Sequence, residues 1–178
     1  MQILKNVLLL LLFSYNCNAL IWPTSNPAFA NGESIEAFVQ ATVSGNPSSG
    51  MYGLVRNKGK KFHEGLDLFG IKFNEKKEVL DSIFAVLPGK VVYINENSNQ
   101  SKYGLYVVLL HKEAGLKFYS LYAHLDSIDG GLRINHFVAE GDRLGRMGNS
   151  AGGYTIPKNR AHLHFEIGLQ LSDNFQSW

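Results

Sequence analysis

The feature that most constrains the fold is a series of short apolar runs separated by turns that contain Gly, Pro or Asn. The runs cover residues 83–87, 90–94, 105–110, 116–122, 144–147 and 162–169. Short strands at this spacing are typical of antiparallel β-structure. No long segment repeats its apolar residues with the 3.6-residue period of a helix. The sequence therefore predicts an all-β fold, mainly an antiparallel sheet with long loops, and only short helical turns.

The composition is that of a globular domain. Hydrophobic residues make up 45% and charged residues 18% of the 178 residues, which excludes wholesale disorder. The net charge is only +2, and no block of Lys and Arg residues is present. We therefore expect no nucleic-acid partner and no tight binding to an anionic membrane.

The N-terminus has the pattern of a secretory signal peptide over residues 1–19. Lys5 precedes an apolar run, 7–13, and the small residues Cys17 and Ala19 provide a cleavage site. A second possible cleavage site follows Ala30. The apolar run is too short to cross a bilayer, which takes about 20 residues. We expect export to the periplasm, cell envelope or extracellular space, with no membrane span left after cleavage.

The remaining chain is predicted to contain one domain. Residues 20–32 are rich in Pro, Asn, Ser and Gly, so we expect a linker or extension over 20–48, with a short helical turn over 33–40. The domain covers 49–170, and residues 44–61, which span its start, are expected to be mostly loop. The tail at 171–178 is compatible with a truncated chain.

The most specific chemical pattern is a His-x-His pair on the last predicted strand. On a strand, alternate side chains point to opposite faces. One face would present His162, His164 and Glu166, and the other would direct Leu163, Phe165 and Ile167 into the core. Two imidazoles on one face suit a metal ligand beside a second functional histidine. The alternative is a pair of surface histidines on a half-exposed strand.

A second pattern is His63 followed four residues later by Asp67. On a straight strand these residues would lie about 13 Å apart, too far to share an ion whose ligands lie about 2.0–2.2 Å from it. Gly65 permits the bend that would bring them together, and Glu64 would then point away. The alternative is a solvated His–Asp pair in a loop.

The other histidines give weaker signals. His124 ends an aromatic-rich strand, and taken alone it would be a core or rim histidine. His111 follows an apolar strand and is expected at a solvated strand end. His136 is expected in a loop. We predict no function for His111 or His136.

Together these residues could form a hydrolytic zinc site. A catalytic zinc ion takes three protein ligands and leaves one position open. Asp67 and two histidines would leave the ion strongly Lewis-acidic, able to lower the pKa of water to near neutrality. Amide hydrolysis also needs a base for the water and a donor for the developing oxyanion. Histidine can serve both purposes.

Three segments, in this order, resemble the motifs of the lysostaphin/LytM-type zinc metallopeptidases. The segments are His63-x-x-x-Asp67, Tyr122-Ala-His124 and His162-x-His164, and further similar segments lie at 87–92, 138–145 and 148–152. The resemblance extends from about Ser49 to Leu169. Members of this family cut peptide bridges or cross-links in peptidoglycan. The resemblance implies an open groove on an antiparallel sheet, with loops as its walls.

The resemblance also assigns roles to five residues. One zinc ion would be bound by His63, Asp67 and His164. His124 and His162 would act on the water and the oxyanion, with either division of the two roles possible.

Two features concern the substrate. Arg56 is a candidate for binding a peptide carboxylate, because its guanidinium matches a planar carboxylate. The segment 154–161 is a longer lead into His-x-His than the family usually has, and it should border the groove.

The predicted function is that of an exported zinc metalloendopeptidase acting on peptidoglycan peptides. The alternative is a non-catalytic LytM-like module that binds and regulates another cell-wall hydrolase. Such modules have lost ligands or catalytic histidines, whereas all five positions are filled here, which favours the enzyme. An unrelated cupin-like zinc barrel is disfavoured because His-x-His comes last in this chain.

Overall fold

The computed structural model describes residues 20–113 and 115–170, so the expected signal peptide and C-terminal tail lie outside the described residues. The strands are β1 (Gly53–Arg56), β2 (Lys61–His63), β3 (Leu66–Phe69), β4 (Ser82–Phe84), β5 (Gly89–Asn95), β6 (Leu105–Glu113), β7 (Leu116–Ile128), β8 (Phe137–Val138), β9 (Arg143–Met147) and β10 (His162–Leu169). The short 3₁₀ turns are η1 (Ile35–Ala37), η2 (Pro47–Gly50), η3 (Ser98–Gln100) and η4 (Lys158–Arg160). In the described part of the chain, no helix is long and apolar enough to cross a membrane.

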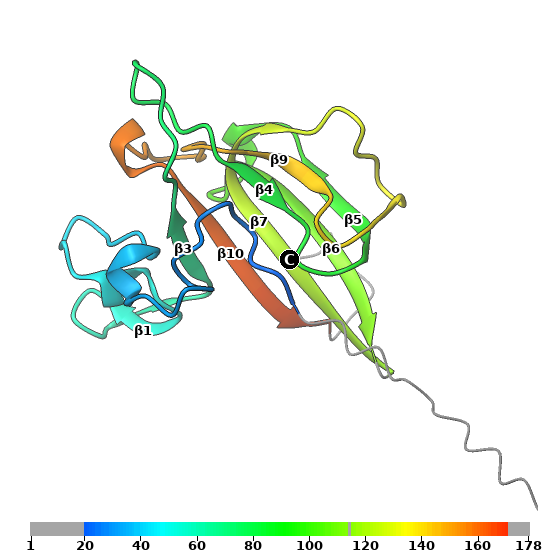
Figure 1. Ribbon diagram of the computed structural model, residues 1–178, viewed down its shortest axis with the longest axis horizontal. Coiled ribbons are helices and arrows are strands. Elements are labelled where there is room, and N and C mark those ends of the chain that lie inside the picture. Colours follow the sequence, from blue (N-terminus) through cyan, green and yellow to red (C-terminus); the bar gives the residue numbers. More distant parts are fainter. Residues whose placement is uncertain (1–19, 114, 171–178) are drawn as a thin grey trace, which may run out of the picture.

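The strands form one large antiparallel sheet and one small hairpin (Figure 1). The order in the large sheet is β3-β10-β7-β6-β5-β8, with β9 joined to both β7 and β4. Strands β1 and β2 pair only with each other. The last strand, β10, thus lies between β3 and β7, which places the His-x-His segment beside the segment that follows His63. The predicted all-β, antiparallel fold is confirmed.

The expected loop over 44–61 is more structured than predicted. It contains η2, β1 and the start of β2. The turn between β1 and β2 places Asn57, Lys58 and Gly59 in the left-handed region, with φ of 51°, 57° and 80°. The many Gly, Asn and Lys residues therefore mark a tight turn between two strands rather than a continuous loop.

Residues 20–48, expected as a linker or extension, pack against the domain. Phe38 and Val39 belong to the buried core, and Trp22 packs against it. Trp22 stacks on Phe29 with ring centroids 4.3 Å apart. The Pro- and Asn-rich composition hid these scattered apolar and aromatic residues.

The two faces of the large sheet are used differently. One face packs on the main core, to which Leu163 and Phe165 contribute from β10. The other face carries a small cluster around Leu121 and Ala123, which pair with Glu166 and His164 across β7 and β10. Directly paired residues in an antiparallel sheet share a face, so this second face is the one that presents the candidate site.

Two predicted side-chain positions need correction. Ile167 was expected in the core, but it is 47% exposed because the outer end of β10 extends beyond the buried core. His111 was expected at a solvated strand end, but it is only 2% exposed. Its Nδ1 donates to the carbonyl of Pro88 (2.8 Å), and its Nε2 lies 2.7 Å from the hydroxyl of Ser120. His111 is therefore a buried residue whose hydrogen bonds connect β6 with β7 and with the start of β5.

His111 should make stability depend on pH. Burial lowers its pKa, an effect that the carbonyl of Pro88 partly offsets. The unfolded chain therefore binds a proton first as the pH falls through about 6.5. The contribution of neutral His111 to the free energy of unfolding is complete above that pH and is lost as the pH falls below it. We expect His111→Gln to reduce the fall in the free energy of unfolding between pH 7.5 and pH 5, measured by urea denaturation. An identical fall in both proteins would contradict this.

Candidate active site

Strand pairing brings the two halves of the candidate metal site together. In the register of β3 and β10, Asp67 lies directly opposite His164, and Phe69 opposite His162. Asp67 and His164 are 4% and 5% exposed. The neighbouring Leu68 and Leu163 are paired and buried on the opposite face. The alternation of polar and apolar residues on both strands therefore directs a carboxylate and an imidazole to the same spot.

His63 reaches this spot because the chain turns between β2 and β3. Strand β2 ends at His63 and β3 begins at Leu66, so the turn lies at Glu64 and Gly65. Glu64 is exposed, as expected for a side chain that points away. Gly65 is needed for close approach: a Cβ there would lie 2.5 Å from the carbonyl oxygen of Phe165 and 2.9 Å from the ring of His164.

Replacing Gly65 by alanine should therefore disturb the geometry of the site, although Gly65 contributes no side chain to it. The new methyl group would push β3 away from β10, at a cost of about 1–3 kcal/mol typical of overpacking. We expect a lower melting temperature and weaker metal binding. Gly130→Ala is the matched control, because nothing lies within 4 Å of the Cβ position at Gly130. Equal melting temperatures for the two variants would show that the close approach at Gly65 is unimportant.

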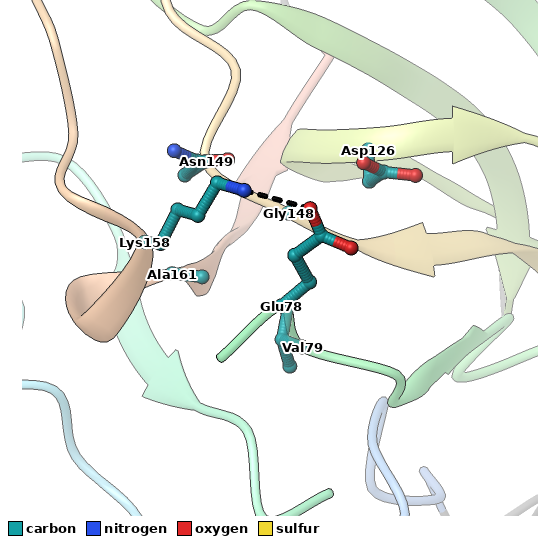
Figure 2. A pocket seen from close by; sticks show the side chains of 7 residues that line it. All are labelled: Glu78, Val79, Asp126, Gly148, Asn149, Lys158 and Ala161. Atoms are coloured by element: carbon teal, nitrogen blue, oxygen red, sulfur yellow. Dashed lines mark hydrogen bonds and ion pairs between the residues drawn. The ribbon is translucent and has the colours of Figure 1, made fainter. Parts of the chain in front are cut away.

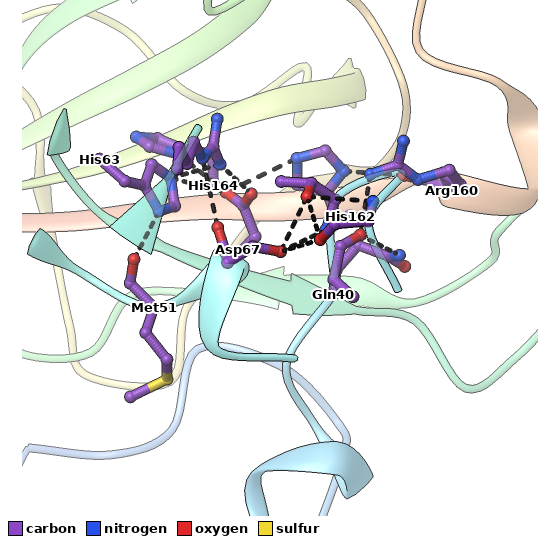
Figure 3. A network of polar contacts seen from close by, with 12 residues as sticks. Gln40, Met51, His63, Asp67, Arg160, His162 and His164 are labelled. Carbon is purple, nitrogen blue, oxygen red and sulfur yellow. Dashed lines mark hydrogen bonds and ion pairs between the residues drawn. The ribbon is translucent and has the colours of Figure 1, made fainter. Parts of the chain in front are cut away.

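The three side chains present their donor atoms as a small triangle (Figure 3). His63 Nε2 lies 3.1 Å from Asp67 Oδ1 and 3.1 Å from His164 Nδ1, and the last two atoms are 3.0 Å apart. A tetrahedral ion with bonds of about 2.0–2.1 Å has donor atoms about 3.3 Å apart. Within the described residues, this is the one group of His, Cys, Asp and Glu side chains that could hold an ion. The donor set fits zinc in both chemistry and size.

The second nitrogen of each of these imidazoles is also bonded. His63 Nδ1 donates to the carbonyl oxygen of Met51 (2.8 Å), so the lone pair of its Nε2 faces the triangle. His164 Nε2 donates to Glu166 Oε1 (2.9 Å), so the lone pair of its Nδ1 can face the triangle. Such outer bonds fix the tautomer and ring orientation of metal-ligating histidines.

The charges in the triangle are strongly coupled. Burial alone would raise the pKa of Asp67, but interactions with His162, His164 and His63 hold it well below its usual range. Burial alone would lower the pKa of His164, but hydrogen bonds to Asp67 and Glu166 raise it to about 9. Asp67 is thus ionised, while a proton competes for His164, so metal binding would release a proton.

The other two candidate histidines lie beside the triangle. The ring centroid of His124 is 4.9 Å from that of His162 and 5.9 Å from that of His164. His124 Nδ1 donates to the carbonyl of Ser150 (2.8 Å), and His162 Nδ1 donates to the carbonyl of Arg160 (2.8 Å). In each ring this leaves Nε2 with a lone pair that can accept a proton.

The backbone at His124 is unusual. Its φ is 59°, in the left-handed region, and the register between β6 and β7 is interrupted between Leu105 and Val107. An irregularity of this kind re-aims a side chain, and such strain is common at functional sites. Burial, together with the charge of nearby His162, lowers the pKa of His124 to about 3. Burial also lowers the pKa of His162. Both rings are therefore neutral at neutral pH.

Arg56 also lies at the site, at the end of β1. Its Nη2 forms an ion pair with Asp67 Oδ2 and lies 2.8 Å from His63 Nε2. The sequence suggested Arg56 as a ligand for a peptide carboxylate. The carboxylate that it contacts in the structure is instead that of Asp67.

Sequence reasoning missed the side chains that support Glu166. The hydroxyl of Tyr103 donates to Glu166 Oε1 (2.5 Å), and that of Tyr119 donates to Oε2 (3.3 Å). The Tyr103 ring also lies 5.3 Å from that of His164. Tyr103 is in a loop about 60 residues away in sequence, and no local pattern indicates this contact.

The long lead into β10 borders the site, as expected. Tyr154 is 49% exposed, and its ring is 6.4 Å from that of His124. At the base of this segment, Lys158 Nζ forms an ion pair with Glu78 Oε1 (2.7 Å) beside a small pocket (Figure 2). The pocket is lined by Glu78, Val79, Asp126, Gly148, Asn149, Lys158 and Ala161. None of the five candidate metal or catalytic residues lines it.

Comparison with known families settles the relationship. The model of peptidase family M23 matches residues 61–174, more than half of the chain. The chain belongs to peptidase family M23. The predicted resemblance to LytM-type peptidases is confirmed, and the M23 assignment makes a peptidase the expected activity. A comparison with curated proteins found no match.

Two solved structures with TM-scores of at least 0.50 share the fold of this chain, and a third, with a lower TM-score, is also similar to it. A protein described as a glycyl-glycine endopeptidase LytM from Ruminococcus gnavus is 28% identical, with a TM-score of 0.50 over 75% of this chain and 51% of that one. A zinc-containing peptidase from Vibrio cholerae is 22% identical, with a TM-score of 0.51 over 75% of this chain and 34% of that one. The catalytic domain of lysostaphin from Staphylococcus simulans is 24% identical, with a TM-score of 0.47 over 69% of this chain and 78% of that one.

The chain corresponds to only a part of several other solved structures that it resembles. It covers 38% of an M23 peptidase from Pseudomonas aeruginosa and 23% of Csd3 from Helicobacter pylori. The activity and substrates of those larger proteins are therefore considered for this chain only as a proposal.

Proposed function

We propose that this chain is an exported zinc metalloendopeptidase that hydrolyses peptide bonds in bacterial peptidoglycan. The observation that carries the proposal is the triangle formed by His63 Nε2, Asp67 Oδ1 and His164 Nδ1, with sides of 3.0–3.1 Å. Membership of the M23 family supports the peptidase activity. The signal-peptide pattern of residues 1–19 supports export.

The three candidate ligands and the two other histidines have different roles, metal binding and proton transfer. When bound, zinc supplies Lewis acidity for the peptide carbonyl and lowers the pKa of water. His63 at the end of β2, Asp67 in β3 and His164 in β10 would hold the ion. Hydrogen bonds to Met51 and Glu166 keep the two ligating nitrogens aimed inward.

His124 and His162 move protons. Each ring donates its Nδ1 proton to a backbone carbonyl, so its Nε2 can accept a proton from water and later donate one to the leaving amine. Once protonated, either ring can also stabilise a developing oxyanion. The non-catalytic alternative is not favoured, because none of these five residues has been lost.

The test is digestion of purified sacculi from two wall types, followed by mass spectrometry of the released fragments. We expect the released fragments to carry new peptide termini at one kind of bond, and only after digestion with the zinc-loaded protein. The wall type that is cut identifies the bond, whether a glycine bridge or a link from D-alanine to a diamino acid. Zinc-loaded protein that releases no fragment from either wall would refute the proposal.

A further inference from the structure

Arg56 forms a hydrogen bond to His63 Nε2, the same atom that a metal ion at this site would need as a ligand. A guanidinium has donors only, so Arg56 Nη2 donates to His63 Nε2 across 2.8 Å. The other ring nitrogen of His63 already donates its proton to Met51. The lone pair of Nε2 is thus the one that would ligate zinc, and it cannot serve Arg56 and a metal ion at the same time.

The position of Arg56 is built into the fold. The left-handed turn at 57–59 follows it directly, and Lys60 donates its backbone N–H to the Arg56 carbonyl (3.1 Å). Farther along the side chain, Nε donates to the carbonyl of Ser49 (3.3 Å). Ser49 is itself buried, and its hydroxyl donates to the carbonyl of Asn46 (2.6 Å). The guanidinium is therefore held from both the strand and the preceding loop.

The contacts of Arg56 have opposite effects on a metal ion. The ion pair uses Asp67 Oδ2 and leaves Oδ1 for the metal, so it helps to orient the carboxylate. The contact with His63 blocks a ligand, and a fixed positive charge repels an incoming dication. The repulsion is strong because the His63 and Asp67 side chains are only 1% and 5% exposed. Asp67 is already oriented by the pairing of β3 with β10, so the opposing effect dominates.

We propose that Arg56 is a partly buried cation of the chain itself that competes with zinc for the candidate site and thereby sets the zinc concentration at which the site fills. The inference rests on the proposed function, since it takes the triangle to be the metal site. It assigns Arg56 a role beyond binding substrate. Without the guanidinium, the His63 lone pair no longer accepts a hydrogen bond from Arg56, and Asp67 loses one of its positively charged partners.

The test measures zinc affinity rather than activity. Chelator-stripped wild type, Arg56→Gln and Arg56→Lys are titrated with zinc against a chromophoric chelator. Arg56→Gln should bind zinc about tenfold more tightly, the equivalent of one charge-assisted hydrogen bond. Arg56→Lys keeps the charge but cannot bridge both His63 and Asp67, so its zinc affinity should lie between those of the wild type and Arg56→Gln. Arg143→Gln is the matched control, because Arg143 pairs with Asp129 on the surface, and its affinity should equal that of the wild type.

Thermal unfolding provides a second measurement. Without zinc, Arg56→Gln should melt below the wild type, and added zinc should raise its melting temperature by more. If Arg56→Gln does not fold, Arg56→Lys carries the test, and an affinity no higher than that of the wild type overturns the inference. A wild type that binds one zinc ion, with Arg56→Gln no tighter, overturns the role of Arg56 alone. A wild type that binds no zinc overturns the proposed function as well.

Discussion

Replacing His164 by alanine is expected to remove zinc and peptidase activity together. The substitution deletes one corner of the donor triangle and leaves Asp67 and Glu166 without the imidazole that bonds to both. Loss of a partner that only supports a ligand typically costs about 10–100-fold in metal affinity, so loss of the ligand itself should cost more. Elemental analysis of the purified protein measures bound zinc, and release of fragments from sacculi measures activity.

His136→Ala is the control for this experiment, because His136 is an exposed loop histidine. It should retain one zinc ion per chain and full activity. Circular dichroism checks that His164→Ala is folded. A folded His164→Ala protein that keeps stoichiometric zinc would show that the triangle is not the metal site.

Replacing His124 should separate chemistry from metal binding. No atom of His124 belongs to the triangle, so zinc should be retained, while turnover should fall about 10²–10⁴-fold if this ring transfers protons. Alanine is a poor choice alone, because φ at this position is 59°. Asparagine tolerates the left-handed region better, so His124→Asn removes the imidazole with less change to the backbone. His162→Ala should behave in the same way.

The measurement pairs zinc content with initial rates on sacculi for each variant. His124→Asn with normal zinc and wild-type rates would remove His124 from the mechanism. A variant that loses zinc as well would instead place this ring among the groups that hold the metal.

Much of the site could be predicted because its signals are local. The alternation in 162–166 places two imidazoles on one face, and Gly65 permits the turn between His63 and Asp67. The structure brings all five candidate residues into one cluster. Their roles stay predictions until the variants are measured.

The missed features depend on partners distant in sequence. His111 looks like a strand-end histidine until the turn at Pro88 covers it. Residues 20–48 look like a linker until Phe38 and Val39 meet the sheet. The contact between Arg56 and Asp67 depends on a hairpin that a run of Gly, Asn and Lys residues concealed. In each case a polar or irregular segment gains its structure from the surface on which it folds.

The pairing of β3 with β10 also has a consequence for the order of events during maturation. A nascent chain that does not yet contain β10 carries only two of the three donor atoms, so it can hold the ion only weakly. An ion that joins both segments would close a loop of about a hundred residues, which restrains the unfolded chain much as a covalent cross-link does. Metal loading would then report that β10 has paired with β3.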